Sequence, residues 1–133
     1  MTNYEELYRL ADEARKKAYA PYSKITVGAA LLAKSGKIYT GSNIENAAFS
    51  PSICAERVAF CAAIHAGERD FVAIAVAGGE EGKGAKDSFP PCGVCRQVMA
   101  EFCSGDFKII FGKGNEETLD RLLPYGFSGD DIK

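Results

Sequence analysis

An uninterrupted apolar run, VAIAVA at residues 72–77, is the feature that most constrains the fold of this chain. A strand that is apolar at every position is typical of a sheet covered on both faces, because neither face is left in water. Helical spacing of apolar residues precedes the run at 54–66 and follows it at 92–102, and residues 107–111 predict another strand. This alternation predicts parallel β-α-β connections and an α/β protein, a three-layer α/β/α sandwich with a mixed sheet.

The N-terminal part of the chain adds a helix and a hairpin to this pattern. Apolar residues at helical spacing predict a first helix that Thr2 or Asn3 caps and Pro21 ends. Residues 26–33 and 37–41 predict two strands joined by a tight Ser-Gly turn. The predicted order is therefore α-β-β-α-β-α-β, followed by at least one short further element.

Length and charge limit the number of domains and the kind of partner. The length of 133 residues predicts one domain, 1–133. Its last predicted element is a short helix over residues 117–123. The formal net charge of −2 and the lack of a basic strip favour a small-molecule substrate over a nucleic acid. The N-terminal stretch MTNYEELYRLADEARKKAYA is charged and amphipathic, and no apolar run has the length of a membrane span. We therefore expect a cytoplasmic protein, without a membrane segment, whose five cysteines are reduced.

Three of the cysteines stand at predicted helix starts, where free backbone N–H groups and the helix dipole stabilise a thiolate. Cys54 precedes one helix, and Cys92 and Cys95 begin another. A separation of three residues puts Cys92 and Cys95 on one helix face, and Gly93 between them allows close approach of the backbone. Three thiolates leave the fourth position of a tetrahedral zinc ion open for water, as in catalytic zinc sites. The sequence thus predicts one catalytic Zn²⁺ per chain.

Glu56 follows Cys54 at a distance of two residues. On a regular helix the two side chains would point about 200° apart, so they converge only if Cys54 lies at the frayed first turn. Glu56 would then stand beside the zinc water as a proton carrier rather than as a ligand. C-x-E followed by P-C-x-x-C is the signature of zinc-dependent deaminases, which hydrolyse an exocyclic amine from a base.

Three thiolates would leave the zinc centre with a net charge of −1, which weakens the metal as an electrophile. Arg57 and Arg96 each lie next to a residue of the motif, and either is placed to donate hydrogen bonds to the sulfurs. The sequence leaves open which arginine does so. Cys61 is predicted to be a small buried apolar group, His65 a partner of the dipole at a helix end, and Cys103 has no predicted role.

Five stretches of the chain together resemble the small, homotetrameric cytidine deaminases over nearly the whole length: AYAPYSKITVGAALL, GSNIENAAFS, CAERVAFCAA, PCGVCRQVMAEF and LLPYGF. The resemblance implies a mixed, about five-stranded sheet flanked by helices, and hydrolysis of cytidine and deoxycytidine to uridine and deoxyuridine with release of ammonia. It also implies a homotetramer with active sites shared between subunits, in which Phe127 reaches a neighbour's site to stack on the base and Phe49 also contributes across subunits.

The same resemblance implies the contacts to the substrate within one chain. Asn43 and Glu45 in SNIEN would hold the ribose, chiefly at its 3′-hydroxyl, and the backbone N–H of Ala55 would bind the base carbonyl. Many members of the family carry Phe where this chain has Ile25, a residue that keeps apolar contact with the base without ring stacking.

Three alternatives to a nucleoside deaminase deserve comparison with the motifs. An antibiotic-modifying deaminase of the blasticidin type shares the C-A-E and P-C-G-x-C-R-Q-V motifs but lacks the pair that Asn43 and Glu45 supply. A nucleic-acid editing enzyme would require an extended basic strip. A structural zinc module that binds a partner would require a fourth ligand at suitable spacing, and would leave Glu56 without a purpose.

Overall fold

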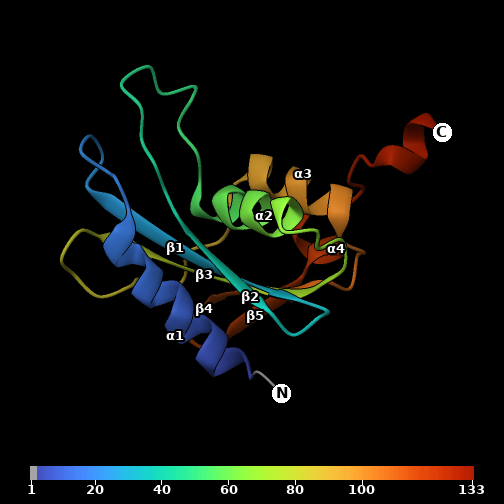
Figure 1. Cartoon of the computed structure of the whole chain (residues 1–133), viewed down its shortest axis with the longest axis horizontal. Coiled ribbons are helices and arrows are strands. Elements are labelled where there is room, and N and C mark those ends of the chain that lie inside the picture. The colour runs from blue at the N-terminus through green and yellow to red at the C-terminus, as the bar shows by residue number, and fades with distance from the viewer. Residues whose placement is uncertain (1–2) are drawn as a thin grey trace.

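The computed structural model describes residues 3–133, and its helices and strands alternate as the sequence predicts (Figure 1). Asn3 caps the first helix by accepting a hydrogen bond from the backbone N–H of Glu6, whereas Thr2, the other predicted cap, lies outside the described residues. None of the helices within residues 3–133 is long and apolar enough to cross a membrane. The elements are α1 (Tyr4–Ala14) with a 3-10 turn (Arg15–Lys17), β1 (Ile25–Ala33), β2 (Ile38–Ser42), α2 (Ala55–His65), β3 (Phe71–Glu80), α3 (Gly93–Phe102), β4 (Lys108–Gly112), β5 (Asn115–Thr118), α4 (Leu119–Leu122) and a 3-10 turn (Gly129–Ile132).

The strands of the described residues form one five-stranded sheet in the order β2-β1-β3-β4-β5. β1 runs antiparallel to both β2 and β3, β3 runs parallel to β4, and β4 runs antiparallel to β5. β3 occupies the centre of the sheet, and residues 73–79 are all buried, which explains the continuous apolar run. The predicted mixed sheet is therefore confirmed.

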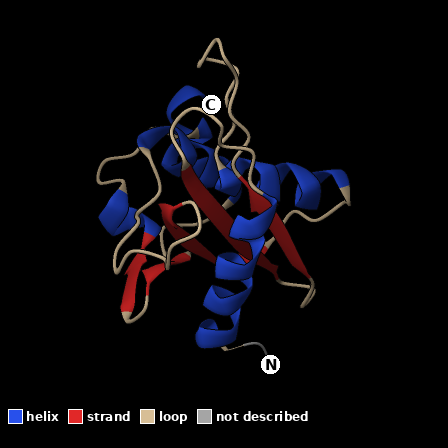
Figure 2. Ribbon diagram, turned by 90° about the vertical axis from the view of Figure 1, so that its left-hand side faces the viewer, coloured by secondary structure: helices blue, strands red, loops and turns tan. Residues whose placement is uncertain are grey.

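Helices cover both faces of this sheet, α1 on one face and α2 with α3 on the other (Figures 1 and 2). Side chains alternate along β3, so that Ile74 and Val76 pack with α2 and α3 while its alanines face α1. The α1 side is packed so closely that a Cβ added to Gly28 of β1 would lie 1.9 Å from the carbonyl oxygen of Ala11. These two cores complete the predicted three-layer α/β/α sandwich.

The C-terminal end of the sheet differs from the prediction of a helix over 117–123. Glu117 belongs to β5, and only Leu119–Leu122 is helical. Gly114 has a φ of 79° and makes the turn that folds β5 back onto β4. The sequence of β5, NEET, is polar and carries no strand pattern, because backbone pairing with β4 rather than an apolar face holds it in place.

Cys61 was predicted to be buried, and this prediction is wrong, since its side chain is exposed. The buried face of α2 contains Ala59, Phe60 and Ala63, which pack on the sheet. The prediction assumed helical spacing from Cys54, but Cys54 precedes the helix in an extended conformation, so that spacing does not set the face of Cys61.

Candidate active site

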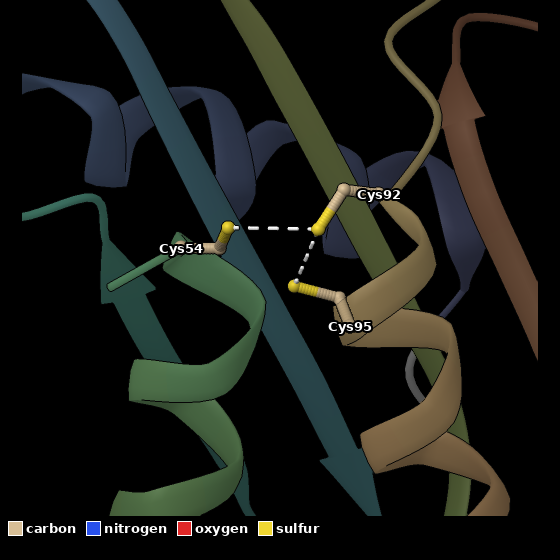
Figure 3. Close-up of side chains that lie close together, drawn as sticks. All are labelled: Cys54, Cys92 and Cys95. Carbon is tan, nitrogen blue, oxygen red and sulfur yellow. Dashed lines mark hydrogen bonds between the residues drawn. The ribbon is translucent and has the colours of Figure 1, made fainter. Parts of the chain in front are cut away.

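Three cysteine sulfurs converge between the N-terminal ends of α2 and α3 (Figure 3). Cys54 is the N-cap of α2 with φ −72° and ψ 151°, and Cys92 is the N-cap of α3 with φ −69° and ψ 168°. Cys95 lies in the first turn of α3 and is buried. The Cys92 Sγ lies 3.8 Å from the Cys54 Sγ and 3.6 Å from the Cys95 Sγ, and all three lie within 4.8 Å of one another.

The spacing and chemistry of the three sulfurs fit one zinc ion. Ligands placed tetrahedrally at the usual Zn–S distance have their sulfurs ~3.8 Å apart. A hydrogen bond from the Cys95 thiol lowers the pKa of Cys54 to about 5, whereas the pKa of Cys95 is raised by the same contact. Cys54 is thus held as a thiolate by its neighbours, and a bound cation would take the place of the proton that the Cys95 thiol carries.

The two arginines that follow the motif residues have different partners. Arg57 Nη2 lies 3.6 Å from the Cys54 Sγ, and its buried Nε has no hydrogen-bond acceptor within residues 3–133. Arg96 instead donates to the backbone carbonyl oxygens of Pro91 and Leu122, at 2.8 Å and 2.7 Å. The guanidinium beside the thiolates is therefore that of Arg57, while Arg96 fastens the chain before α3 to the end of α4.

We expect Arg57→Gln to lose about 10–100-fold in zinc affinity or turnover, because residues that hydrogen-bond to metal ligands typically contribute that much. Metal titration and initial rates measure the two quantities. Arg96→Gln is the matched control, since it removes the same charge one residue after a sulfur ligand but without a bond to sulfur. An equal loss of zinc affinity in both variants would contradict the assignment of charge compensation to Arg57.

Glu56 lies in the first turn of α2 and is 4% exposed. Burial raises the pKa of its carboxyl group to about 7. The three-sulfur cluster does not include this carboxyl group, although Glu56 and two of the cysteines line the same cleft. The extended conformation of Cys54 provides the geometry that the sequence required for the two side chains to converge.

A cleft of about 850 Å³ opens over Glu56 and the sulfurs, a size typical of small-molecule sites. Its walls come from the start of β1, the segment between β2 and α2, the N-terminal end of α2, and the loop before α3. Of the predicted site residues, it brings together Ile25, Asn43, Glu45, Phe49, Cys54, Ala55, Glu56, Arg57 and Cys92, whereas Cys95, Arg96 and Phe127 do not line it.

The side chains of the predicted ribose ligands, Asn43 and Glu45, also form hydrogen bonds that link the segments lining the cleft. The Asn43 amide accepts from the Val27 N–H at 2.8 Å and donates to the Ile25 carbonyl at 2.9 Å, which continues the pairing of β1 with β2. Glu45 accepts from the Tyr22 N–H at 2.9 Å, and hydrogen bonds from Ser23 lower its pKa. Glu45 is therefore a carboxylate at neutral pH, and carboxylates accept several hydrogen bonds at once.

Two predicted aromatic residues lie on segments that project from the body of the chain (Figure 1). Phe49 is 73% exposed, adopts the left-handed conformation with φ 60°, and contacts Tyr22 edge-on with ring centroids 6.4 Å apart. Phe127 is 56% exposed, and its carbonyl oxygen accepts from Gln97 of α3 at 2.9 Å. Phe49 lies at the rim of the cleft, whereas Phe127 lies beyond it.

Phe89 lines the cleft beside Cys92, and the sequence did not single it out. Its backbone N–H donates to the carbonyl oxygen of Phe111 in β4 at 2.7 Å, which fixes the loop before α3 to the sheet. The available signal was an aromatic residue three positions before Cys92, in the rigid stretch S-F-P-P-C. The surrounding segment is rich in Gly and Pro, which predicts a loop and gives this ring no particular role.

The sandwich fold and the three-thiolate site beside a buried glutamate are those of a zinc-dependent deaminase. The model of the cytidine and deoxycytidylate deaminase zinc-binding region matches residues 1–113. The chain is 48% identical to a cytidine deaminase of Sporosarcina psychrophila, over 96% of this chain and 93% of that protein, and 47% identical to one of Halalkalibacterium halodurans, over 95% of each. A crystal structure of a cytidine deaminase from Burkholderia pseudomallei superposes with a TM-score of 0.84 at 41% identity, covering 96% of this chain and 100% of that one. The chain therefore belongs to the cytidine and deoxycytidylate deaminase family.

Proposed function

We propose that this chain is a cytidine deaminase, which converts cytidine or deoxycytidine and water into uridine or deoxyuridine and ammonia. The observation that carries the proposal is the buried carboxyl group of Glu56 in one cleft with the metal-binding sulfurs. The cytidine deaminases of Sporosarcina psychrophila and Halalkalibacterium halodurans, which align with nearly the whole chain, support it. Residues 1–133 act as one catalytic domain.

Zinc, when bound by Cys54, Cys92 and Cys95, supplies a water that is activated at neutral pH. Glu56 takes one proton from the attacking water and delivers it to N3 of the base, and it then takes the second proton from the new hydroxyl group on C4 and delivers it to the departing amine. The backbone N–H of Ala55, at the N-terminal end of α2, holds the base carbonyl. The burial of Glu56 keeps bulk water from the carboxyl group that carries these protons.

Asn43 and Glu45 bind the sugar and make a free nucleoside the substrate. Both line the cleft, and their hydrogen bonds to the chain fix their orientation before substrate arrives. A substrate that lacks the sugar cannot make the hydrogen bonds that the sugar hydroxyls make to these two side chains, and a loss of this kind gives large discrimination. Cytosine is therefore a poor substrate. The carboxylate of Glu45 also disfavours a phosphorylated nucleotide.

The substrate experiment follows loss of the 4-amino group by ultraviolet absorbance, for cytidine, deoxycytidine, cytosine, cytidine monophosphate and blasticidin S. We expect similar efficiency for the two nucleosides and at least about 100-fold lower efficiency for cytosine, because the hydrogen bonds to the sugar hydroxyls are lost. Cytosine or the nucleotide reacting as fast as cytidine would refute the role of Asn43 and Glu45. Activity on blasticidin S alone would favour the antibiotic-modifying alternative.

We further propose a homotetramer in which Phe127 and Phe49 complete the sites of neighbouring subunits. The exposure of both rings, and the position of Phe127 outside its own cleft, support this arrangement. Phe127→Ala is expected to raise the KM for cytidine by about tenfold, the typical effect of losing one aromatic contact. Light scattering checks the assembly, and a fully active monomer or an unchanged KM would contradict the shared site.

A cytoplasmic location is also part of the proposal. All five cysteines of the chain are free thiols, and three of them form the metal cluster. Free thiols and thiolate ligands persist in a reducing compartment, which supports this location.

A further inference from the structure

Phe89 is distinguished from the other aromatic side chains of the cleft by its depth. Among the rings that line the cleft in the described residues, Tyr22 and Phe49 are 53% and 73% exposed and lie at the rim. Phe89 is half-buried, packs against the core between the sheet and α2, and lies near Cys92. It is therefore the least exposed of the three aromatic rings that line the cleft in the described residues.

Phe89 has a fixed position because it lies directly on the backbone of β3. A Cβ added to Gly78 would come within 2.6 Å of the ring atoms Cγ and Cδ1 of Phe89, so the ring rests where a side chain of β3 would otherwise stand. The hydrogen bond from its backbone to Phe111 holds it from the other side. Because both the ring and the backbone of Phe89 are held in place, this side chain has little freedom to move aside for a larger ligand.

The chemistry of the proposed reaction, on which this inference rests, determines which edge of the base meets this side chain. The reacting carbon C4 must face the sulfur cluster of Cys54, Cys92 and Cys95, because the water that a zinc ion would activate there has to reach it. N3 and the base carbonyl face α2, where Glu56 and Ala55 act on them. C5 and C6 form the opposite edge of the six-membered ring, and they therefore face away from α2, toward Phe89 and Pro90, which line the cleft from the segment before α3.

We infer that Phe89 is a specificity-determining residue, whose ring over Gly78 limits the space beside C5 of the pyrimidine. The enzyme thus discriminates against cytidines that carry a substituent at C5, with 5-methylcytidine as the simplest example. A cytidine with hydrogen at C5 fits against the ring face, which supplies apolar contact to the base.

The test compares kcat/KM for 5-methylcytidine with kcat/KM for cytidine in zinc-loaded enzyme. We expect the unaltered enzyme to favour cytidine, and Phe89→Val to raise the ratio of 5-methylcytidine to cytidine by about tenfold, the scale of one methyl group in an apolar pocket. Gly78→Ala tests the opposite direction, because its methyl group pushes the ring away from β3 and toward the cleft. This variant is expected to lower the ratio.

Tyr4→Val is the control, since it replaces an aromatic ring on α1, on the face of the sheet opposite the cleft, and its ratio should equal that of the unaltered enzyme. A ratio unchanged in Phe89→Val, in enzyme that still deaminates cytidine with one zinc per chain, would overturn the inference alone. Equal efficiency of the unaltered enzyme on both nucleosides would also overturn it. Absence of any turnover of cytidine by the zinc-loaded, unaltered enzyme would instead overturn the proposed function and the inference with it.

Discussion

Replacing Glu56 by glutamine is expected to abolish nearly all turnover while the fold and the zinc content remain unchanged. The amide has almost the shape of the carboxyl group but cannot carry a proton between water, N3 and the departing amine. General acid–base catalysis alone typically contributes about 10²–10⁴-fold, and Glu56 is assigned several proton transfers, so the loss should be at least of that order. Steady-state rates with cytidine, together with metal analysis of the same preparation, measure both effects.

Glu101→Gln is the control for this experiment, because it removes one carboxylate from an exposed position on α3. Its rate should match that of the unaltered enzyme. If Glu56→Gln keeps a near-native rate, Glu56 has no part in the mechanism. If the variant instead loses its zinc, the carboxyl group contributes to the metal site, and the separation of ligands from proton carrier proposed here is wrong.

Replacing Cys54 by alanine is expected to strip the metal, from one zinc per chain to nearly none, and to remove activity with it. Two thiolates remain, and the shared geometry of the three sulfurs is lost. The same change should lower the free energy of unfolding under zinc-replete conditions. A ligand present at a thousand times its Kd stabilises the native state by about 4 kcal/mol, and that contribution disappears when the metal no longer binds.

Cys61→Ala provides the matched control, since Cys61 is a free, exposed thiol on α2 that lies outside the cluster. It should keep one zinc per chain and the melting temperature of the unaltered protein. A chelator should lower the melting temperature of Cys61→Ala but leave that of Cys54→Ala unchanged. Stoichiometric zinc in Cys54→Ala would show that the ligand set is wrong.

The fold could be predicted from the sequence wherever burial leaves a pattern in the residues. The apolar run of β3 and the helical spacing in α2 and α3 determine the three layers, because these elements bury their apolar faces in the core. The sequence of β5 has no such pattern. The strand is polar, and it is stabilised by backbone hydrogen bonds with β4, which do not depend on the type of side chain. The exposure of Cys61 could not be predicted, because it depends on the residue at which α2 begins, and the spacing of the cysteines does not determine that residue.

The metal cluster could be predicted because helix starts and the three-residue spacing of Cys92 and Cys95 have a direct geometric meaning. The choice between Arg57 and Arg96 could not, because adjacency in sequence does not set the direction of a long side chain. The position of Phe89 in the cleft could not be predicted for a related reason. The ring reaches the cleft only through the packing of a loop on Gly78 of β3, a contact between distant parts of the chain.

The most direct test of the account measures the initial rate of cytidine deamination while zinc is returned stepwise to metal-free enzyme. Ultraviolet absorbance follows the conversion of cytidine to uridine, and metal analysis gives the zinc bound per chain. The account predicts that the rate rises in proportion to bound zinc and levels off at one zinc per chain. Turnover that is independent of zinc, or no turnover of cytidine at full zinc occupancy, would contradict it.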